Sequence, residues 1–319
     1  MTHAITRRQA MAAAGGALAA WQVKGAFAAD LPVVRVGIIP IFVVAPHIVA
    51  DKMGYFAAEG ISVATQMIQG GTIGVPALVS GGFDILYSNT TAILTALERG
   101  IDLRILAEGT RIPKAPPDPA AIIQRKGGGL KTGKDLEGKS IGINTRFDIQ
   151  WLIAQAWIKK TGGDPTKVTF REVPLPAMMD AVKGGQVDAA VLVDPFLAIA
   201  LGNPDFELLD WAQSKVMPGY PSSLWVVTAE TAATKADLLR RWVRGFYKGA
   251  EWVNANIGDP AYMQLVAGYT KTDEKLLAKM ALNKQPMDID AAGVDKVAAL
   301  MQDNGILKTN IDVTPNIFK

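Results

Sequence analysis

The sequence predicts an α/β fold in two lobes, each a mainly parallel sheet flanked by helices. Short runs rich in β-branched residues alternate with helical patterns, which is typical of βαβ units. Two stretches interrupt this alternation and indicate linkers: a proline-rich one at residues 113–119, and one with two prolines and a glycine at 216–223. A short pattern also occurs once in each half of the chain: Ala77, Gly81 and Asp84 match Ala181, Gly185 and Asp188.

The first lobe is expected to contain four strands and three helices. The apolar runs predict strands at residues 34–39, 61–68, 83–87 and 103–107. Helices are expected at 46–59, 73–80 and 91–99, the first of them ending at Gly60 because glycine favours a helix C-terminus.

The second lobe repeats the alternation of strands and helices. We expect strands at 121–124, 140–143, 168–173 and 189–193, and helices at 150–161 and 177–183. A strand at 224–228 and a mainly helical region follow, with 238–256 as the longest helix. The predicted organisation is therefore a first lobe at 29–118, a second lobe at 119–223, and a return to the first lobe at 224–319.

The first 28 residues carry the features of a cleaved export signal. Arg7 and Arg8 precede a weakly apolar run at 11–20, and small residues follow at 26–29. The segment resembles a twin-arginine (Tat) signal, which implies export by the twin-arginine translocase. An ordinary Sec signal with an accidental arginine pair is the alternative. Either route places the mature protein in the periplasm, with cleavage expected after Ala28.

Composition excludes several classes of function. The signal carries three of the 33 basic residues and no acidic residue, so the mature part has 30 basic and 30 acidic residues. This balance, without a basic stretch, argues against nucleic acid as a partner. The chain has no cysteine and only two histidines, His3 and His47. Thiolate metal sites and His-based catalytic sites therefore lack residues, and we expect no metal, no cofactor and no enzymatic activity.

An ordered series of short motifs resembles a known protein family. The series begins with Val36-Gly37-Ile38, Asp51-Lys52-Met53-Gly54-Tyr55-Phe56 and Gly81-Gly82-Phe83-Asp84-Ile85, and continues with Asp135-Leu136-Glu137-Gly138-Lys139 and Asp194-Pro195. It is similar to the nitrate/sulfonate/taurine-type (NMT1/THI5-like) periplasmic substrate-binding proteins of ABC transporters. The resemblance implies a type II periplasmic-binding fold with a ligand cleft between the lobes. It also implies delivery of a small molecule to an inner-membrane ABC permease, by what we expect to be a monomer.

Polar and aromatic residues follow several of the predicted strands. Ligands of open α/β sheets bind outside the carboxyl ends of the strands, near helix N-termini. Small donors at Ser88–Thr90 together with Arg146 would suit an anion, and the phenylalanines would stack on a planar ligand. The candidate ligand-binding residues are Phe42, His47, Ser88, Asn89, Thr90, Thr145, Arg146, Phe147, Asp194 and Phe196.

Each candidate also has a structural explanation. Ser88, Asn89 and Thr90 could cap a helix, Arg146 could pair with Asp148, and the aromatic rings could belong to the core. The expected ligand is a small organic anion, such as an alkyl or aromatic sulfonate or carboxylate. A thiamine-precursor-like pyrimidine or another heterocycle is the alternative. Two further alternatives are a sensor for a membrane receptor and an NMT1/THI5-like enzyme, which the absence of cysteine disfavours.

Overall fold

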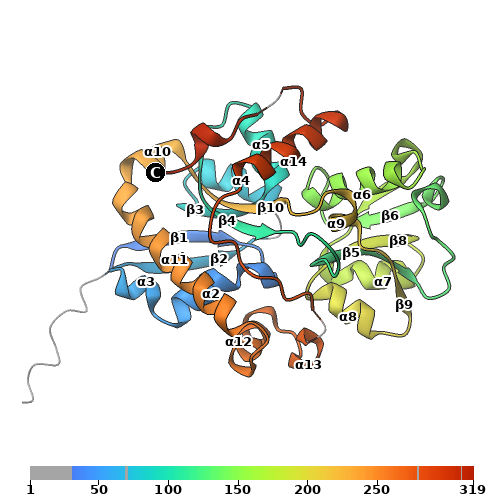
Figure 1. Ribbon diagram of the computed structural model, residues 1–319, viewed down its shortest axis with the longest axis horizontal. Helices are drawn as coiled ribbons and strands as arrows, with labels where there is room; N and C mark the ends of the chain where they lie inside the picture. Colours follow the sequence, from blue (N-terminus) through green and yellow to red (C-terminus); the bar gives the residue numbers. More distant parts are fainter. Residues whose placement is uncertain (1–30, 69–70, 279, 310) are drawn as a thin grey trace, which may run out of the picture. The chain divides into compact units, whose positions relative to one another are not determined.

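Two five-stranded sheets, each accompanied by helices, organise the chain (Figure 1). The computed structural model describes residues 31–68, 71–278, 280–309 and 311–319. The expected export signal at 1–28 lies outside the described residues. Residues Val33–Lys319 form one compact unit, which contains both sheets.

The first sheet has the strand order β2-β1-β3-β10-β4. Its strands are β1 (Val33–Ile38), β2 (Ser62–Met67), β3 (Ile85–Asn89), β4 (Leu103–Arg111) and β10 (Pro221–Thr228). β1 runs parallel to β2 and β3, whereas β10 is antiparallel to both β3 and β4. Four strands therefore point one way and β10 points the other.

The second sheet repeats this arrangement with the order β7-β6-β8-β5-β9. Its strands are β5 (Ala120–Arg125), β6 (Ser140–Ile143), β7 (Thr169–Glu172), β8 (Ala189–Val193) and β9 (Phe206–Asp210). Here β5 is the reversed strand, antiparallel to β8 and β9. No strand was expected from the sequence at the position of β9. The expected strands at the other nine positions are present, with β4 extending four residues beyond the expected end at Ala107.

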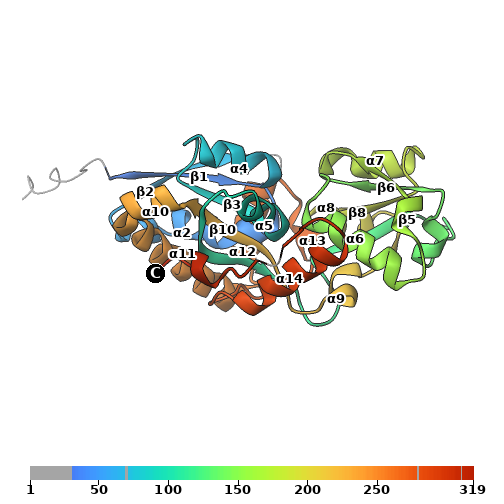
Figure 2. The ribbon, with the colours of Figure 1, turned by 90° about the horizontal axis from the view of Figure 1, so that it is seen from above.

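The helices accompany the two sheets in separate groups. Helices α2–α5, α10 and α11 contact the first sheet or one another, and α6–α9 accompany the second sheet (Figures 1 and 2). Their bounds are α2 (Ala45–Lys52), α3 (Tyr55–Ala58), α4 (Gly71–Val79), α5 (Thr90–Glu98), α6 (Ile149–Lys160), α7 (Met178–Lys183), α8 (Phe196–Gly202), α9 (Ala212–Val216), α10 (Ala229–Thr234), α11 (Ala236–Asn256), α12 (Pro260–Thr270), α13 (Glu274–Leu277) and α14 (Ala291–Asp303).

The single helix expected at 46–59 is two helices, α2 and α3. Gly54 separates them, because its φ of 72° lies in the left-handed region, where an α-helix cannot continue. The break lets α2 and α3 each pack against α11.

Helix α11 packs closely on α2 and α3 because it carries glycine at the contact points. A Cβ added to Gly249 would lie 2.2 Å from the carbonyl oxygen of Pro46, and one added to Gly245 would lie 2.5 Å from the ring of Phe56. Trp242 and Phe246 on the same helix stack 5.1 Å apart and are buried beside Trp225 of β10. No helix in the described residues is both long enough and apolar enough to cross a membrane.

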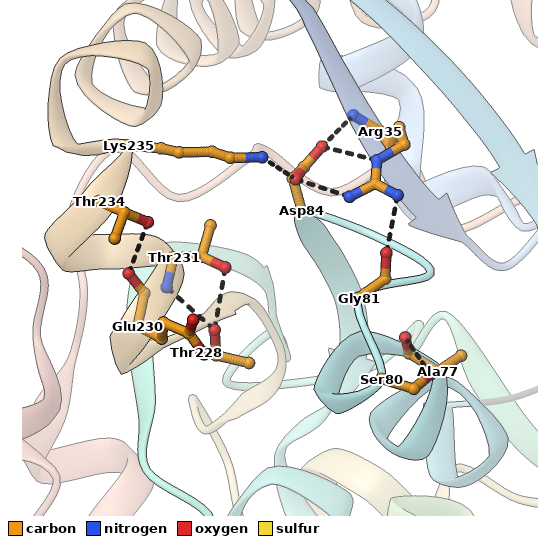
Figure 3. A network of polar contacts seen from close by, with 10 residues as sticks. All are labelled: Arg35, Ala77, Ser80, Gly81, Asp84, Thr228, Glu230, Thr231, Thr234 and Lys235. Atoms are coloured by element: carbon orange, nitrogen blue, oxygen red, sulfur yellow. Dashed lines mark hydrogen bonds and ion pairs between the residues drawn. The ribbon is translucent and has the colours of Figure 1, made fainter.

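An aspartate joins two neighbouring strands at the same point of each sheet. Asp84 accepts a hydrogen bond from the backbone N–H of Arg35 at 2.9 Å, and Asp188 accepts one from the N–H of Ser140 at 2.8 Å. Around Asp84 the guanidinium of Arg35 and the ammonium of Lys235 complete an ionic network (Figure 3). The Ala-Gly-Asp pattern in the sequence therefore corresponds to one repeated structural feature.

Candidate functional site

A cleft lies at the carboxyl ends of strands from both sheets. It is a hollow of about 840 Å³, part of it open to solvent. Residues after β1, at the end of β3 and at the start of β10 line it from the first sheet, and residues after β6 and β8 line it from the second. Its apolar walls are Ile39, Ile41, Val43, Ile112, Pro119, Ala120, Ile149, Leu175, Val191 and Val193. Its polar lining is Tyr87, Asn89, Thr110, Asn144, Thr145, Asp148, Gln150, Asp194, Gln213, Ser222 and Ser223.

Asn89 enters the cleft from the first sheet with its donor group free. It is the N-cap of α5, and its Oδ1 accepts a hydrogen bond from the N–H of Ala92 at 2.9 Å. The hydroxyl of Thr91 lies 2.6 Å from the same oxygen. Both contacts use Oδ1, so the amide Nδ2 of Asn89 is the group left to donate to a ligand.

Two serines of β10 line the same side of the cleft. The ladder between β10 and β4 shifts register between Pro221 and Ser223 and again between Ser223 and Leu224. Such bulges change which way consecutive side chains point. The Oγ of Ser223 accepts a hydrogen bond from the hydroxyl of Tyr87 at 2.8 Å, which leaves the Ser223 proton available as a second donor.

The second sheet contributes acceptors. The Nε2 of Gln213 donates to the hydroxyl of Tyr220 at 3.2 Å, and its buried Oε1 has no partner among the described residues. The Oε1 of Gln150, on the first turn of α6, is likewise buried without a partner in that part of the chain. A buried carbonyl oxygen left unpaired costs free energy, so a ligand N–H would be favoured there.

Two carboxyl groups, Asp148 and Asp194, also line this part of the cleft. Asp148 is the N-cap of α6 and accepts from the N–H of Trp151 at 2.8 Å. Asp194 accepts from the N–H groups of Ala198 and Ala281, both at 3.1 Å. Burial raises the pKa of each carboxyl to about 7, although these backbone hydrogen bonds act in the opposite direction. Near neutral pH each group is therefore close to half ionised.

The cleft has an acidic rather than a basic character. Among the described residues that line it, none is lysine, arginine or histidine. The N-terminus of α6, which could otherwise bind an anion, is already occupied by the Asp148 carboxyl group. No group of three or more metal-ligating side chains comes together in the described residues.

The structure brings three of the candidate residues together in the cleft. Asn89, Thr145 and Asp194 line it. Phe196 lines a neighbouring hollow that shares Ile39, Ile41 and Thr145 with the cleft. That hollow is mainly apolar.

Four other candidates are structural. Phe42 is buried and packs edge-on against Tyr262, with the ring centroids 6.0 Å apart. Thr90 donates to the carbonyl of Pro221 at 2.7 Å, and Ser88 is fully buried within β3. His47 is fully buried beside the rings of Phe56 and Trp225, and burial lowers its pKa to about 3, so the ring is neutral. These side chains are buried and do not line the cleft.

Arg146 and Phe147 also lie outside the cleft. Both line a separate pocket beside α4 and α5. Phe147 has a φ of 64°, and this left-handed conformation changes the direction of the chain after Thr145. The expected pairing of Arg146 with Asp148 is absent: the guanidinium donates to the carbonyl oxygen of Phe170 at 2.9 Å.

Several lining residues were not among the candidates. Asn144 and Asp148 belong to the same strand-end loop as Thr145, so strand-end position was a signal for them. Ser222 and Ser223 lie in a stretch that the sequence analysis interpreted as a linker. Gln213 and Gln150 sit on helices, and no pattern in the sequence distinguishes them from ordinary surface glutamines.

Several solved structures with a similar fold are periplasmic binding proteins. The aliphatic sulphonate binding protein SsuA from Escherichia coli matches with a TM-score of 0.73 and 16% identity, covering 90% of this chain and 97% of that one. SsuA from Xanthomonas axonopodis pv. citri, bound to MOPS, gives 0.74 and 17%, with coverages of 89% and 97%. The nitrate-binding protein NrtA from Synechocystis PCC 6803 gives 0.73 and 13%, with coverages of 89% and 84%. Their fold, the two-lobed periplasmic-binding fold expected from the sequence, is therefore the fold of this chain.

Family membership rests on the sequence match. No curated protein matches the chain. The model of the family described as NMT1/THI5 like matches residues 41–257, which is more than half of the 319 residues. The matched range includes every lining residue described above except Ile39. The chain belongs to the NMT1/THI5-like family.

Proposed function

We propose that this protein is a periplasmic solute-binding protein that delivers a small molecule to an ABC permease in the inner membrane, and that it is not an enzyme. Membership of the NMT1/THI5-like family and the likeness to the sulphonate- and nitrate-binding proteins support this role. The lining of the cleft fits ligand binding without catalysis: its groups are hydrogen-bond donors, acceptors and apolar walls.

We further propose that the ligand is a neutral molecule with N–H groups, such as a heterocycle, rather than a sulfonate or carboxylate. One observation carries this choice: the described cleft residues include two carboxyl groups and no cationic side chain. An anion would meet Asp148 and Asp194 without a counter-charge. The guanidinium on which the expected anion site depended, that of Arg146, lines a different pocket.

The donors and acceptors of the cleft are segregated, which orients such a ligand. The first sheet offers the Nδ2 of Asn89 and the hydroxyl of Ser223 as donors. The second sheet side offers the unpaired carbonyl oxygens of Gln150 and Gln213 as acceptors. A ligand with a carbonyl or ring nitrogen at one edge and N–H groups at the other would satisfy both sides, as a lactam or aminopyrimidine does.

Delivery requires the two lobes to move, and we propose the boundaries 29–118, 119–223 and 224–319 for them. The chain passes between the sheets at residues 112–119 and 211–220, and residues of both connections line the cleft. Rotation about these connections would open and close it.

We also propose that residues 1–28 direct export by the Tat route. Normal periplasmic delivery of an Arg7→Lys, Arg8→Lys precursor would contradict that route.

Thermal denaturation with ligand panels tests the binding proposal. The mature protein is melted with neutral pyrimidines and lactams, alkyl and aryl sulfonates, aromatic carboxylates and nitrate. A ligand at a hundred times its Kd stabilises the folded state by about 2.7 kcal/mol, so binding is readily seen. We expect stabilisation by a neutral compound that is lost in Gln213→Leu. Stabilisation by an anion alone, retained in Gln213→Leu, would overturn the ligand assignment.

A further inference from the structure

A second pocket lies outside the cleft and contains two of the expected ligand-binding residues, Arg146 and Phe147. It is a hollow of about 840 Å³ lined by Thr95, Arg99, Arg146 and Phe147 together with apolar residues. The apolar walls are Val75, Pro76, Ala92, Ala96, Ile101 and Ile306. It shares no lining residue with the cleft.

The two guanidinium groups of this pocket have most of their donors free. The Arg146 side chain makes one hydrogen bond within the described residues, from Nη2 to the carbonyl of Phe170. Arg99 is exposed at the C-terminal end of α5, and its side chain makes no hydrogen bond or ion pair with any of the described residues. A guanidinium group has five N–H donors, so the pocket offers several donors to an anion.

No carboxylate competes for these cations in the pocket lining. The ten described residues that line it include no aspartate or glutamate. The carboxylate of Glu172 accepts a hydrogen bond from the backbone N–H of Arg146 at 2.6 Å, and not from the Arg146 side chain. In the first sheet, by contrast, Arg35, Arg104 and Arg111 are each paired with a carboxylate.

A buried hydroxyl and an exposed ring complete the pocket. The Oγ1 of Thr95 is buried and has no hydrogen-bond partner among the described residues. The side chain of Phe147 is 52% exposed, although its ring packs edge-on against that of Trp151, with the ring centroids 4.9 Å apart. A buried hydroxyl without a partner and a half-exposed ring on an apolar wall are both costly features, and a ligand covering them would relieve both.

We propose that this pocket is a second binding site, which takes a small organic anion: a carboxylate or sulfonate carrying an aromatic or aliphatic body. The anionic group pairs with Arg99 and Arg146, the hydroxyl of Thr95 donates to it, and the body packs against Phe147 and the apolar walls. The site is distinct from the cleft, because none of its lining residues contributes to the cleft lining.

Calorimetric titration with benzenesulfonate as the probe tests the proposal. Wild type should bind one equivalent, and the double variant Arg99→Gln with Arg146→Gln should bind at least about tenfold more weakly, since charge-assisted hydrogen bonds are lost. Benzamide, a neutral analogue, and inorganic sulfate, an anion without a body, should each bind more weakly than benzenesulfonate. Thr95→Val should weaken binding less than the double variant.

Two matched variants keep the result specific. Arg171→Gln removes an exposed arginine of β7 that does not line the pocket, and it should leave benzenesulfonate binding unchanged. Gln213→Leu alters the cleft and should also leave it unchanged. Equal binding to wild type and to a folded double variant would overturn the proposal, as would loss of binding in Gln213→Leu. Equal affinity for benzamide or for sulfate would overturn the assigned ligand class.

Discussion

The hydroxyl of Thr91 lies 2.9 Å from the backbone carbonyl oxygen of Phe147 and 2.6 Å from the Oδ1 of Asn89. The hydroxyl has one proton, so it is shared between a residue of the cleft and a residue of the flanking pocket. Thr91 is the second residue of α5, the helix that follows β3 of the first sheet, and Phe147 lies in the loop after β6 of the second. One side chain thus connects both sites and both sheets.

Replacing Thr91 with valine should destabilise the protein. Thr91→Val keeps the shape of the side chain and removes the proton donated to Phe147, at a cost of about 1 kcal/mol in the free energy of unfolding. Urea denaturation measures the change. Thr95→Val, one turn further along α5, is the matched control: its Oγ1 has no partner in the described structure, so its loss should be neutral or slightly stabilising. Equal destabilisation by both variants would count against a bond at Thr91.

Replacing Asn89 with aspartate should impair ligand binding without unfolding α5. Asn89→Asp retains an oxygen that caps the helix and removes the Nδ2 donor, so we expect ligand affinity to fall by about tenfold or more. Titration with the ligand found in the thermal screen measures it. Asn203→Asp is the control, because Asn203 also accepts a backbone N–H, that of Asp205 at 2.9 Å, and lines neither pocket. Unchanged affinity in Asn89→Asp would remove Asn89 from the site.

The stability of the protein should depend on pH through Asp148. Its pKa is about 7 in the folded protein and near 3.8 in the unfolded chain. Its favourable contribution is therefore complete below pH 4 and is lost as the pH rises through about 7, since the unfolded state ionises first. Asp148→Asn keeps an acceptor for the N–H of Trp151 and cannot ionise. The melting temperature of Asp148→Asn minus that of wild type should increase as the pH is raised from 5 to 8. A difference independent of pH would contradict the raised pKa.

Alanine at Gly249 should be strongly destabilising. The added Cβ would lie 2.2 Å from the backbone oxygen of Pro46, so α11 and α2 would have to separate, at a cost of about 1–3 kcal/mol or more. Gly268 on α12 provides the opposite case, since an added Cβ there meets nothing within 4 Å. Gly268→Ala should stabilise the protein by up to about 1 kcal/mol, because alanine favours the helix. Chemical denaturation of both variants measures the contrast.

The sequence predicts strands better where burial is strong. The strand at 140–143 was predicted with its observed bounds, and its last three residues are buried. β9 was not predicted, because it forms an edge of the second sheet and only Phe206 of its five residues is fully buried. Without either alternation or a continuous apolar run, its sequence carries no strand signal.

Part of the candidate site could be predicted for a similar reason. Asn89 ends the parallel strand β3 and Asp194 directly follows β8, and the position of a strand end determines that such residues reach the cleft. Arg146 is only three residues beyond β6, yet it lines the separate pocket beside α5. The strand-end rule places a loop at the edge of the sheet but does not say in which direction each of its side chains points, so the pocket that receives the guanidinium could not be predicted.

The hydrogen bond between the N–H of Ala281 and the carboxyl of Asp194 has a mechanical consequence. It attaches the segment that follows α13 to the loop after β8, and so adds a non-covalent tie, besides the Thr91–Phe147 hydrogen bond, to the two chain connections between the sheets. A rotation about an axis through the two connections preserves this bond only if the bond lies on that axis; otherwise opening must break it. The carboxyl group that accepts it has a pKa of about 7. The strength of the tie, and with it the stiffness of the lobes toward each other, should therefore vary with pH near neutrality.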